Sequence, residues 1–60
     1  MMEGLPKDPI LLLSVVNTKL RDFYPGLNEL CRDLGVDKHE LEKKLETAGY
    51  AYESSVNQFI

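Results

Sequence analysis

Residues 27–45 read LNELCRDLGVDKHELEKKL, and this stretch predicts two helices joined by a tight turn. Before Gly35, leucine and cysteine recur at spacings of three and four residues, which is the pattern of an amphipathic helix. Gly35 can adopt the left-handed conformation that commonly follows the last turn of a helix. Asp37, with Glu40 three residues later, is the capping-box pattern that opens the next helix.

The same stretch has the spacing of a helix-turn-helix motif, a common DNA-binding unit. Such a motif needs a small residue on its first helix, a glycine four residues later, and an apolar residue directly after that glycine. Cys31, Gly35 and Val36 supply these, and Leu41 is the apolar anchor on the second helix, although Lys44 stands where a third buried residue is usual. On a DNA-binding interpretation the groove-facing residues are Lys38, His39, Glu42 and Lys43.

The charges of this segment disfavour nucleic acid as a partner, although they leave it open. Residues 26–48 hold four cationic and six anionic side chains, and the whole chain has a net charge of −3. Binding to DNA depends on neutralising phosphates with Lys and Arg, so an acidic segment has the wrong sign. These side chains are more typical of a solvated helix surface.

The first helix is predicted over residues 8–24. Asp8 can accept a backbone hydrogen bond as N-cap, and Pro9 suits the first helical position, where its missing N–H costs nothing. Apolar residues follow at spacings of three and four, which predicts one buried face. That face consists of Leu13, Val16, Leu20 and either Phe23 or Tyr24.

The fold class that follows is a mainly α, three-helix domain with a packed tail. Tyr50 and Tyr52 alternate with Ala51 and Glu53, which is typical of a strand, so the tail is a short β-hairpin or an extended segment. A lone hairpin is unstable in water and must pack on the helices. The expected core residues of the helix pair are Leu30, Leu34, Leu41, Leu45 and Ala48. The predicted segments are an arm over 1–7 anchored by Leu5, helices over 8–24, 26–34 and 37–48, and a tail over 50–60.

Length and composition exclude several classes of protein. Sixty residues make one small domain with marginal stability, and the single cysteine and single histidine allow neither an internal disulfide nor a Cys/His zinc site. The longest apolar stretch, Ile10 to Val16, is too short to cross a membrane and lacks the features of a signal peptide. We therefore expect a cytoplasmic protein without cofactor or metal. No catalytic motif is present, and a chain this short has little room for a closed pocket, so we expect no enzyme.

The start of the first helix is apolar almost all round. From Ile10 to Val16 only Ser14 is polar, yet only one face of the helix can meet the other two helices. A leftover apolar patch on a small protein marks an interaction site. We expect a second copy of the chain to cover it in a homodimer, which is the commonest symmetric assembly. The alternative cover is the protein's own tail.

Three segments of the sequence resemble a family of short bacterial proteins classed as a domain of unknown function, number 4250. They are LPKDPILLLSVVNTKLRDFY, LNELCRDLGVDKHELEKKLETAGYAY and NQF, so the resemblance extends from Leu5 to Phe59. Such proteins usually carry serine at the position of Gly26, and the glycine of this chain weakens the N-cap of the second helix. The resemblance implies a bacterial, cytoplasmic protein and transfers no activity or catalytic residue.

These observations favour a non-enzymatic protein-interaction module that self-associates, with a small DNA-binding regulator as the alternative. Asn17, Lys19, Arg21 and Asp22 are polar residues of the segment most distinctive of the family, and neither capping nor packing explains all of them. We expect them to contact the tail around Asn57 and Gln58, or a partner protein. The candidate interaction residues are Leu11, Leu12, Val15, Asn17, Lys19 and Arg21.

Overall fold

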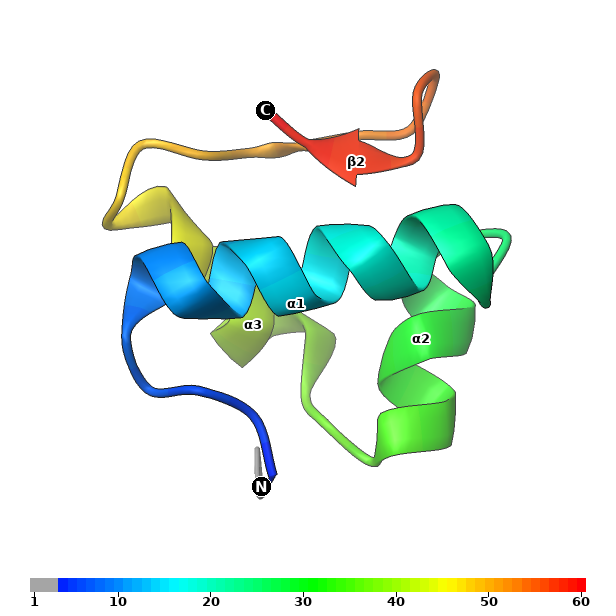
Figure 1. Cartoon of the computed structure of the whole chain (residues 1–60), viewed down its shortest axis with the longest axis horizontal. Helices are drawn as coiled ribbons and strands as arrows, with labels where there is room; N and C mark the ends of the chain where they lie inside the picture. Colours follow the sequence, from blue (N-terminus) through cyan, green and yellow to red (C-terminus); the bar gives the residue numbers. More distant parts are fainter. Residues whose placement is uncertain (1–3) are drawn as a thin grey trace.

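The computed structural model describes residues 4–60 and contains three helices and a C-terminal hairpin (Figure 1). The helices are α1 (Pro9–Asp22), α2 (Leu27–Leu34) and α3 (Lys38–Glu46). Two short strands, β1 (Tyr52–Glu53) and β2 (Gln58–Phe59), pair antiparallel, with Tyr52 opposite Phe59. In Figure 1, α1 lies between the hairpin on one side and α2 on the other. The predicted mainly α fold with a helix pair and a C-terminal hairpin is confirmed.

Each helix begins at a residue whose conformation the sequence explains. The Asp8 carboxylate accepts hydrogen bonds from the backbone N–H groups of Ile10 and Leu11, at 2.8 and 3.3 Å. The Asp37 carboxylate accepts one from the N–H of Glu40 at 3.0 Å. Helix α2 begins after Gly26, which has no side chain to cap it. Gly35 ends α2 in the left-handed conformation at φ +67°. The helix-turn-helix-like geometry therefore rests on the local signals that predicted it.

The core combines all three helices with one residue of the tail. Phe59 of β2 is 2% exposed and lies among side chains that the three helices contribute. Leu5, at the start of the described chain, is half-buried against this core, as are Tyr50 and Tyr52 of the tail. The buried core residues are Leu12, Val16, Leu20, Leu27, Leu30, Cys31, Val36, Leu41, Leu45 and Phe59.

The buried face of α1 differs from the predicted one. Leu12, rather than Leu13, is buried with Val16 and Leu20, at spacings of four throughout, and Leu13 is half-buried. Phe23 is 71% exposed, because α1 ends there and the chain turns, so Tyr24 is the aromatic residue that packs against the core. Periodicity alone could not choose between faces in a segment that is apolar all round.

Two further core assignments need correction. Leu34 and Ala48 are half-buried, since both lie at helix ends where neighbouring turns no longer cover them.

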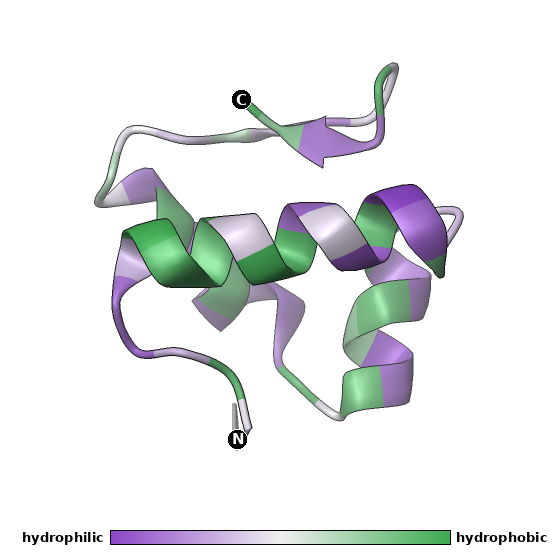
Figure 2. Cartoon of the chain, viewed as in Figure 1, coloured by the Kyte–Doolittle hydropathy of each residue, from purple (hydrophilic) through white to green (hydrophobic). Residues whose placement is uncertain are grey.

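Helix α1 ends at Asp22 and α3 at Glu46, each two residues before the predicted end. Hydropathy along α1 is also uneven: Figure 2 shows hydrophobic residues in its first half and hydrophilic residues toward its C-terminal end.

Candidate functional site

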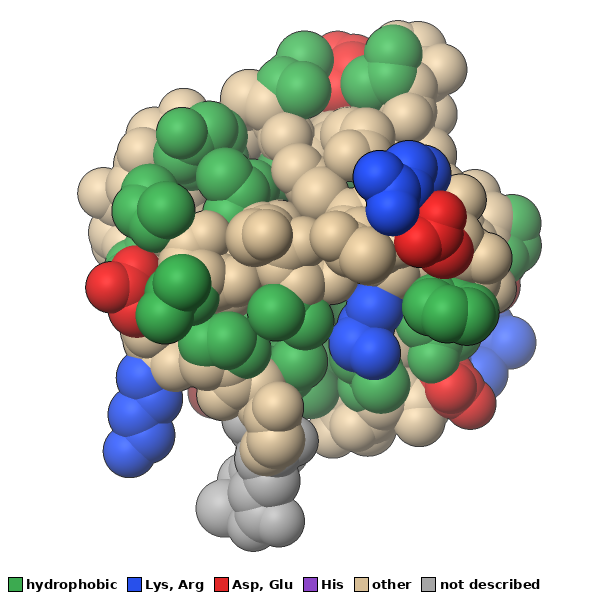
Figure 3. Space-filling view, viewed as in Figure 1, with side chains coloured by type: hydrophobic (Ala, Val, Ile, Leu, Met, Phe, Trp, Pro, Cys, Tyr) green, Lys and Arg blue, Asp and Glu red, His purple; other side chains and the backbone are tan. Residues whose placement is uncertain are grey.

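The first turn of α1 exposes apolar side chains to solvent. Ile10 and Leu11 are 55% and 59% exposed, whereas Val15 is half-buried. Figure 3 shows hydrophobic side chains gathered over the N-terminal half of α1 and charged ones over its C-terminal half. Of the candidate interaction residues, Leu12 must be removed, because its side chain is fully buried in the core and cannot reach a partner. Leu11 remains the most accessible apolar candidate.

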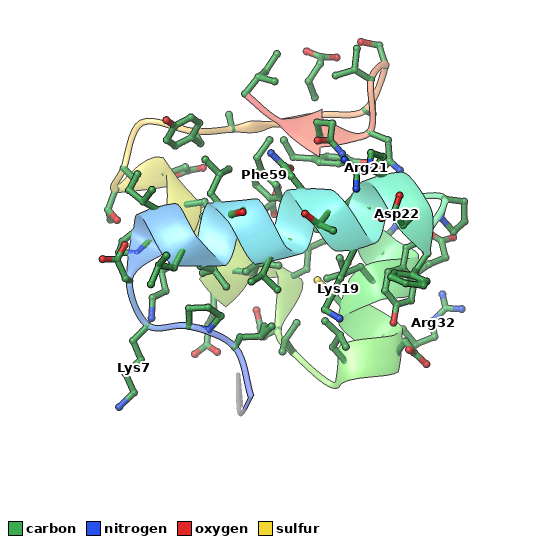
Figure 4. The ribbon with its side chains drawn as sticks, in the orientation of Figure 1. Lys7, Lys19, Arg21, Asp22, Arg32 and Phe59 are labelled. Atoms are coloured by element: carbon green, nitrogen blue, oxygen red, sulfur yellow. The ribbon has the colours of Figure 1, made fainter. Side chains whose placement is uncertain are left out.

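Asn17 does not face a free surface, because its side chain binds the backbone of the tail. Its Nδ2 donates to the carbonyl oxygen of Phe59 at 3.0 Å, and its Oδ1 accepts from the Phe59 N–H at 2.8 Å. One carboxamide thus pairs with both backbone groups of one residue, as a neighbouring strand would. In Figure 4, Phe59 lies between the hairpin and α1.

Two tail side chains donate hydrogen bonds to backbone carbonyl groups of α1 and of Tyr24, which follows it. Gln58 Nε2 donates to the carbonyl oxygen of Asn17 at 3.0 Å. Asn57 Nδ2 donates to the carbonyl oxygens of Leu20 and Tyr24, both at 3.0 Å. We call Asn17, Asn57 and Gln58 the clasp. The predicted contact of Asn17 with the tail is confirmed. Within the clasp, Asn57 satisfies the Leu20 carbonyl, which belongs to the last turn of α1 and has no partner within the helix.

Tyr52 completes the hairpin side of the clasp. Its hydroxyl donates to Asn57 Oδ1 at 2.6 Å, and its ring packs on that of Phe59 with centroids 5.5 Å apart. Asn57 adopts a positive φ of 53°, a conformation that asparagine tolerates better than most residues. The turn of the hairpin and the clasp therefore depend on the same residue.

The remaining polar candidates of α1 stay outside the clasp. Arg21 donates from Nε and Nη2 to the two carboxylate oxygens of Asp22, each at 2.9 Å, and both side chains are exposed. The hydrogen bond from Arg21 lowers the pKa of Asp22. Lys19 is half-buried on the side of α1 that faces α2 in Figure 4. The exposed ion pair between Arg21 and Asp22 adds little stability, so these two side chains are available to solvent or a partner.

The candidate DNA-facing residues lie on α3, mostly on its surface. Lys38, His39 and Lys43 are exposed, and Glu42 is half-buried. Within residues 4–60, no three His, Cys, Asp or Glu side chains are grouped closely enough to hold a metal ion. Cys31 is buried, and burial raises the pKa of its thiol, which disfavours the reactive thiolate.

A shallow hollow at the junction of α1 and α2 was not expected from the sequence. Tyr24, Glu29, Arg32 and Asp33 line it. The Tyr24 hydroxyl donates to the Asp33 carboxylate, and this bond raises the pKa of Tyr24. No short motif joins residues nine apart across a Pro-Gly turn, so only the fold brings this pair together.

The fold and its surfaces define a small, mainly α domain in which a hairpin is fixed to the first helix by side-chain amides. A family model described as Domain of unknown function (DUF4250) matches residues 6–59, nearly the whole chain. The chain belongs to this family, as its resemblance implied. No curated protein and no solved structure matches it. Within residues 4–60, no helix has both the length and the apolar content to span a membrane.

Proposed function

We propose that this chain is a non-enzymatic protein-interaction module of the bacterial cytoplasm that self-associates. The observation that supports this is the exposure of Ile10 and Leu11, which are consecutive residues in the first turn of α1. Two adjacent large apolar side chains that remain more than half exposed after folding are typical of an interaction site. The tail covers the middle of α1, where Phe59 is bound by Asn17, but leaves these two side chains exposed.

Size supports a second copy as the partner. The folded chain exposes 3960 Å², and a standard interface buries about 800 Å² on each partner, about a fifth of this surface. Burying such an area would add apolar contacts that a 60-residue core cannot supply alone.

Sedimentation equilibrium at micromolar to millimolar concentration tests the proposal. We expect a monomer–dimer equilibrium, weakened at least tenfold when Ile10→Ser and Leu11→Ser are combined. Phe23→Ser is the matched control, because Phe23 is also exposed but lies at the other end of α1. A monomer at every concentration would contradict self-association, and equal weakening by the control would contradict the assignment to the first turn.

The alternative function, sequence-specific DNA binding, is favoured by one observation. Gly35 joins α2 and α3 with helix-turn-helix-like geometry, and Lys38, His39 and Lys43 are exposed on α3. The charge of the segment opposes it, so we place it second.

A further inference from the structure

The hairpin has two edges, and within residues 4–60 only one of them is occupied by other parts of the chain. Ala51 and Ile60 exchange two backbone hydrogen bonds of 2.9 Å, so the next pair along the ladder, Tyr52 and Phe59, is a non-hydrogen-bonded pair. In such a pair the backbone N–H and C=O groups of each residue point away from the other strand. On the β2 side these groups of Phe59 meet the Asn17 carboxamide.

On the β1 side the corresponding groups of Tyr52 have no hydrogen-bond partner among residues 4–60. The contacts of β1 are chiefly with β2, whereas β2 also packs on α1. The hairpin therefore presents one free strand edge, centred on Tyr52. Natural proteins usually cover or charge such an edge, because it is a template for pairing with another chain.

We propose that the β1 edge pairs antiparallel with the β1 edge of a second copy, across a two-fold axis at Tyr52. This inference rests on the proposed self-association for its occupant, and it adds a backbone contact separate from the first turn of α1. Tyr52 of each copy would donate its N–H to the Tyr52 carbonyl of the other. The two hairpins would form one four-stranded antiparallel sheet.

The sequence around Tyr52 is complementary to itself in this register. Pairing about Tyr52 puts Glu53 opposite Ala51 of the other copy, so the two Glu53 carboxylates do not face each other directly. The two Tyr52 residues become opposite neighbours, which is a favourable cross-strand pair for aromatic side chains. Tyr50 lies opposite Ser54 of the other copy. The Tyr50 N–H already donates to the Leu45 carbonyl at 3.1 Å, so at this pair the ladder can be extended only from the Ser54 N–H to the Tyr50 carbonyl.

Amide hydrogen exchange of the full chain, followed by NMR at several concentrations, tests this edge directly. We expect the Tyr52 N–H to exchange fast in dilute solution and at least tenfold more slowly where the chain is dimeric. The Phe59 N–H is the internal reference, because Asn17 protects it at every concentration.

A backbone variant removes the donor alone. Ligation of two synthetic segments at Cys31 gives the chain with an ester in place of the Tyr52 amide, which deletes the outward N–H and keeps the side chain. We expect dimerisation to weaken at least tenfold, since both copies lose a bond. Tyr52→Phe is the comparison variant: it removes the hydroxyl bond to Asn57 but keeps the outward N–H, so it should weaken dimerisation less than the ester does.

The outcomes separate the two proposals. The edge assignment is overturned if the chain dimerises but the exchange rate of the Tyr52 N–H does not change with concentration. It is also overturned if the ester variant dimerises as strongly as the parent chain. Either result leaves the proposed self-association intact. A chain that stays monomeric throughout overturns both. Retained Phe59 protection in the ester variant shows that the hairpin is still folded, so weaker dimerisation then supports the edge.

Discussion

Asn17 is the residue on which the attachment of the tail most depends. Its carboxamide is the hydrogen-bond partner of both backbone groups of Phe59, and these bonds are partly buried. A partly buried backbone group that loses its partner costs about 1–3 kcal/mol. Asn17→Ala should therefore lower the free energy of unfolding by about that amount, measured by urea denaturation.

Two variants show whether geometry or mere polarity matters at this position. Asn17→Asp keeps an acceptor for the Phe59 N–H but sets a carboxylate against the Phe59 carbonyl, so it should be at least as destabilising as alanine. Thr18→Ala, at the exposed neighbouring position, should be nearly neutral. Equal denaturation midpoints for all three variants would contradict the clasp.

Tyr24 gives a pH-dependent test at the α1–α2 junction. The hydrogen bond to Asp33 raises the pKa of Tyr24 above its usual value of 10.0. Because the folded pKa is the higher one, this bond stabilises the fold fully below pH 10 and is lost as the pH rises through the raised pKa. An NMR titration of the Tyr24 ring should show the pKa falling in Asp33→Asn; an unchanged pKa would show that the carboxylate is not its cause.

At the scale of the elements, the start of α2 is the weakest of the three helix starts. Gly26 is in an extended conformation and offers no side-chain cap. A Cβ there would approach only the Glu29 side chain, whose flexible end would lie closest, with Oε1 at 2.7 Å. Gly26→Ser adds an N-cap oxygen and stiffens the unfolded chain, so it should stabilise the fold by roughly 0.3–1 kcal/mol. Thermal melting measures this, with Gly26→Ala as the control that stiffens the chain without adding a cap.

Helix α3 contributes to the core mainly through two leucines, Leu41 and Leu45, both fully buried. Leu→Ala at such a site costs about 2–5 kcal/mol, which approaches the whole stability of a small domain. Leu45→Ala should leave much of the population unfolded at 37 °C, as measured by circular dichroism. The same substitution at half-buried Leu34 should cost less. A melting curve identical to that of the parent would contradict the place of Leu45 in the core.

The elements that sequence predicted best are those specified by residues close together in the chain. Asp8, Gly35 and Asp37 act on their immediate neighbours, so their roles follow from spacing alone. The face of α1 did not follow, because the apolar run from Ile10 to Val16 offers several faces and only the packed tail selects one. Asn17 was predicted to contact the tail, but its two bonds to Phe59 depend on joining residues 42 positions apart, which no local pattern encodes.

At the scale of the whole molecule, charge decides how the chain should behave toward nucleic acid. The net charge is −3, and the exposed cations of α3 are interspersed with carboxylates. Fluorescence anisotropy with random duplex DNA at low salt should show no binding tighter than micromolar. Tighter binding that Lys38→Glu and Lys43→Glu together abolish would instead favour the DNA-binding alternative.

The clasp also has a consequence for the order in which the domain folds. Its bonds close a loop of 42 residues, whereas the turn between α2 and α3 closes within a few positions. Loop closure costs more entropy as the loop lengthens, so we expect the helix pair to form the folding nucleus and the hairpin to dock after the rate-limiting step. Stability lost at Asn17 should then appear as faster unfolding with little change in the folding rate. Docking of the hairpin would then slow unfolding, so it would set the lifetime of the folded state.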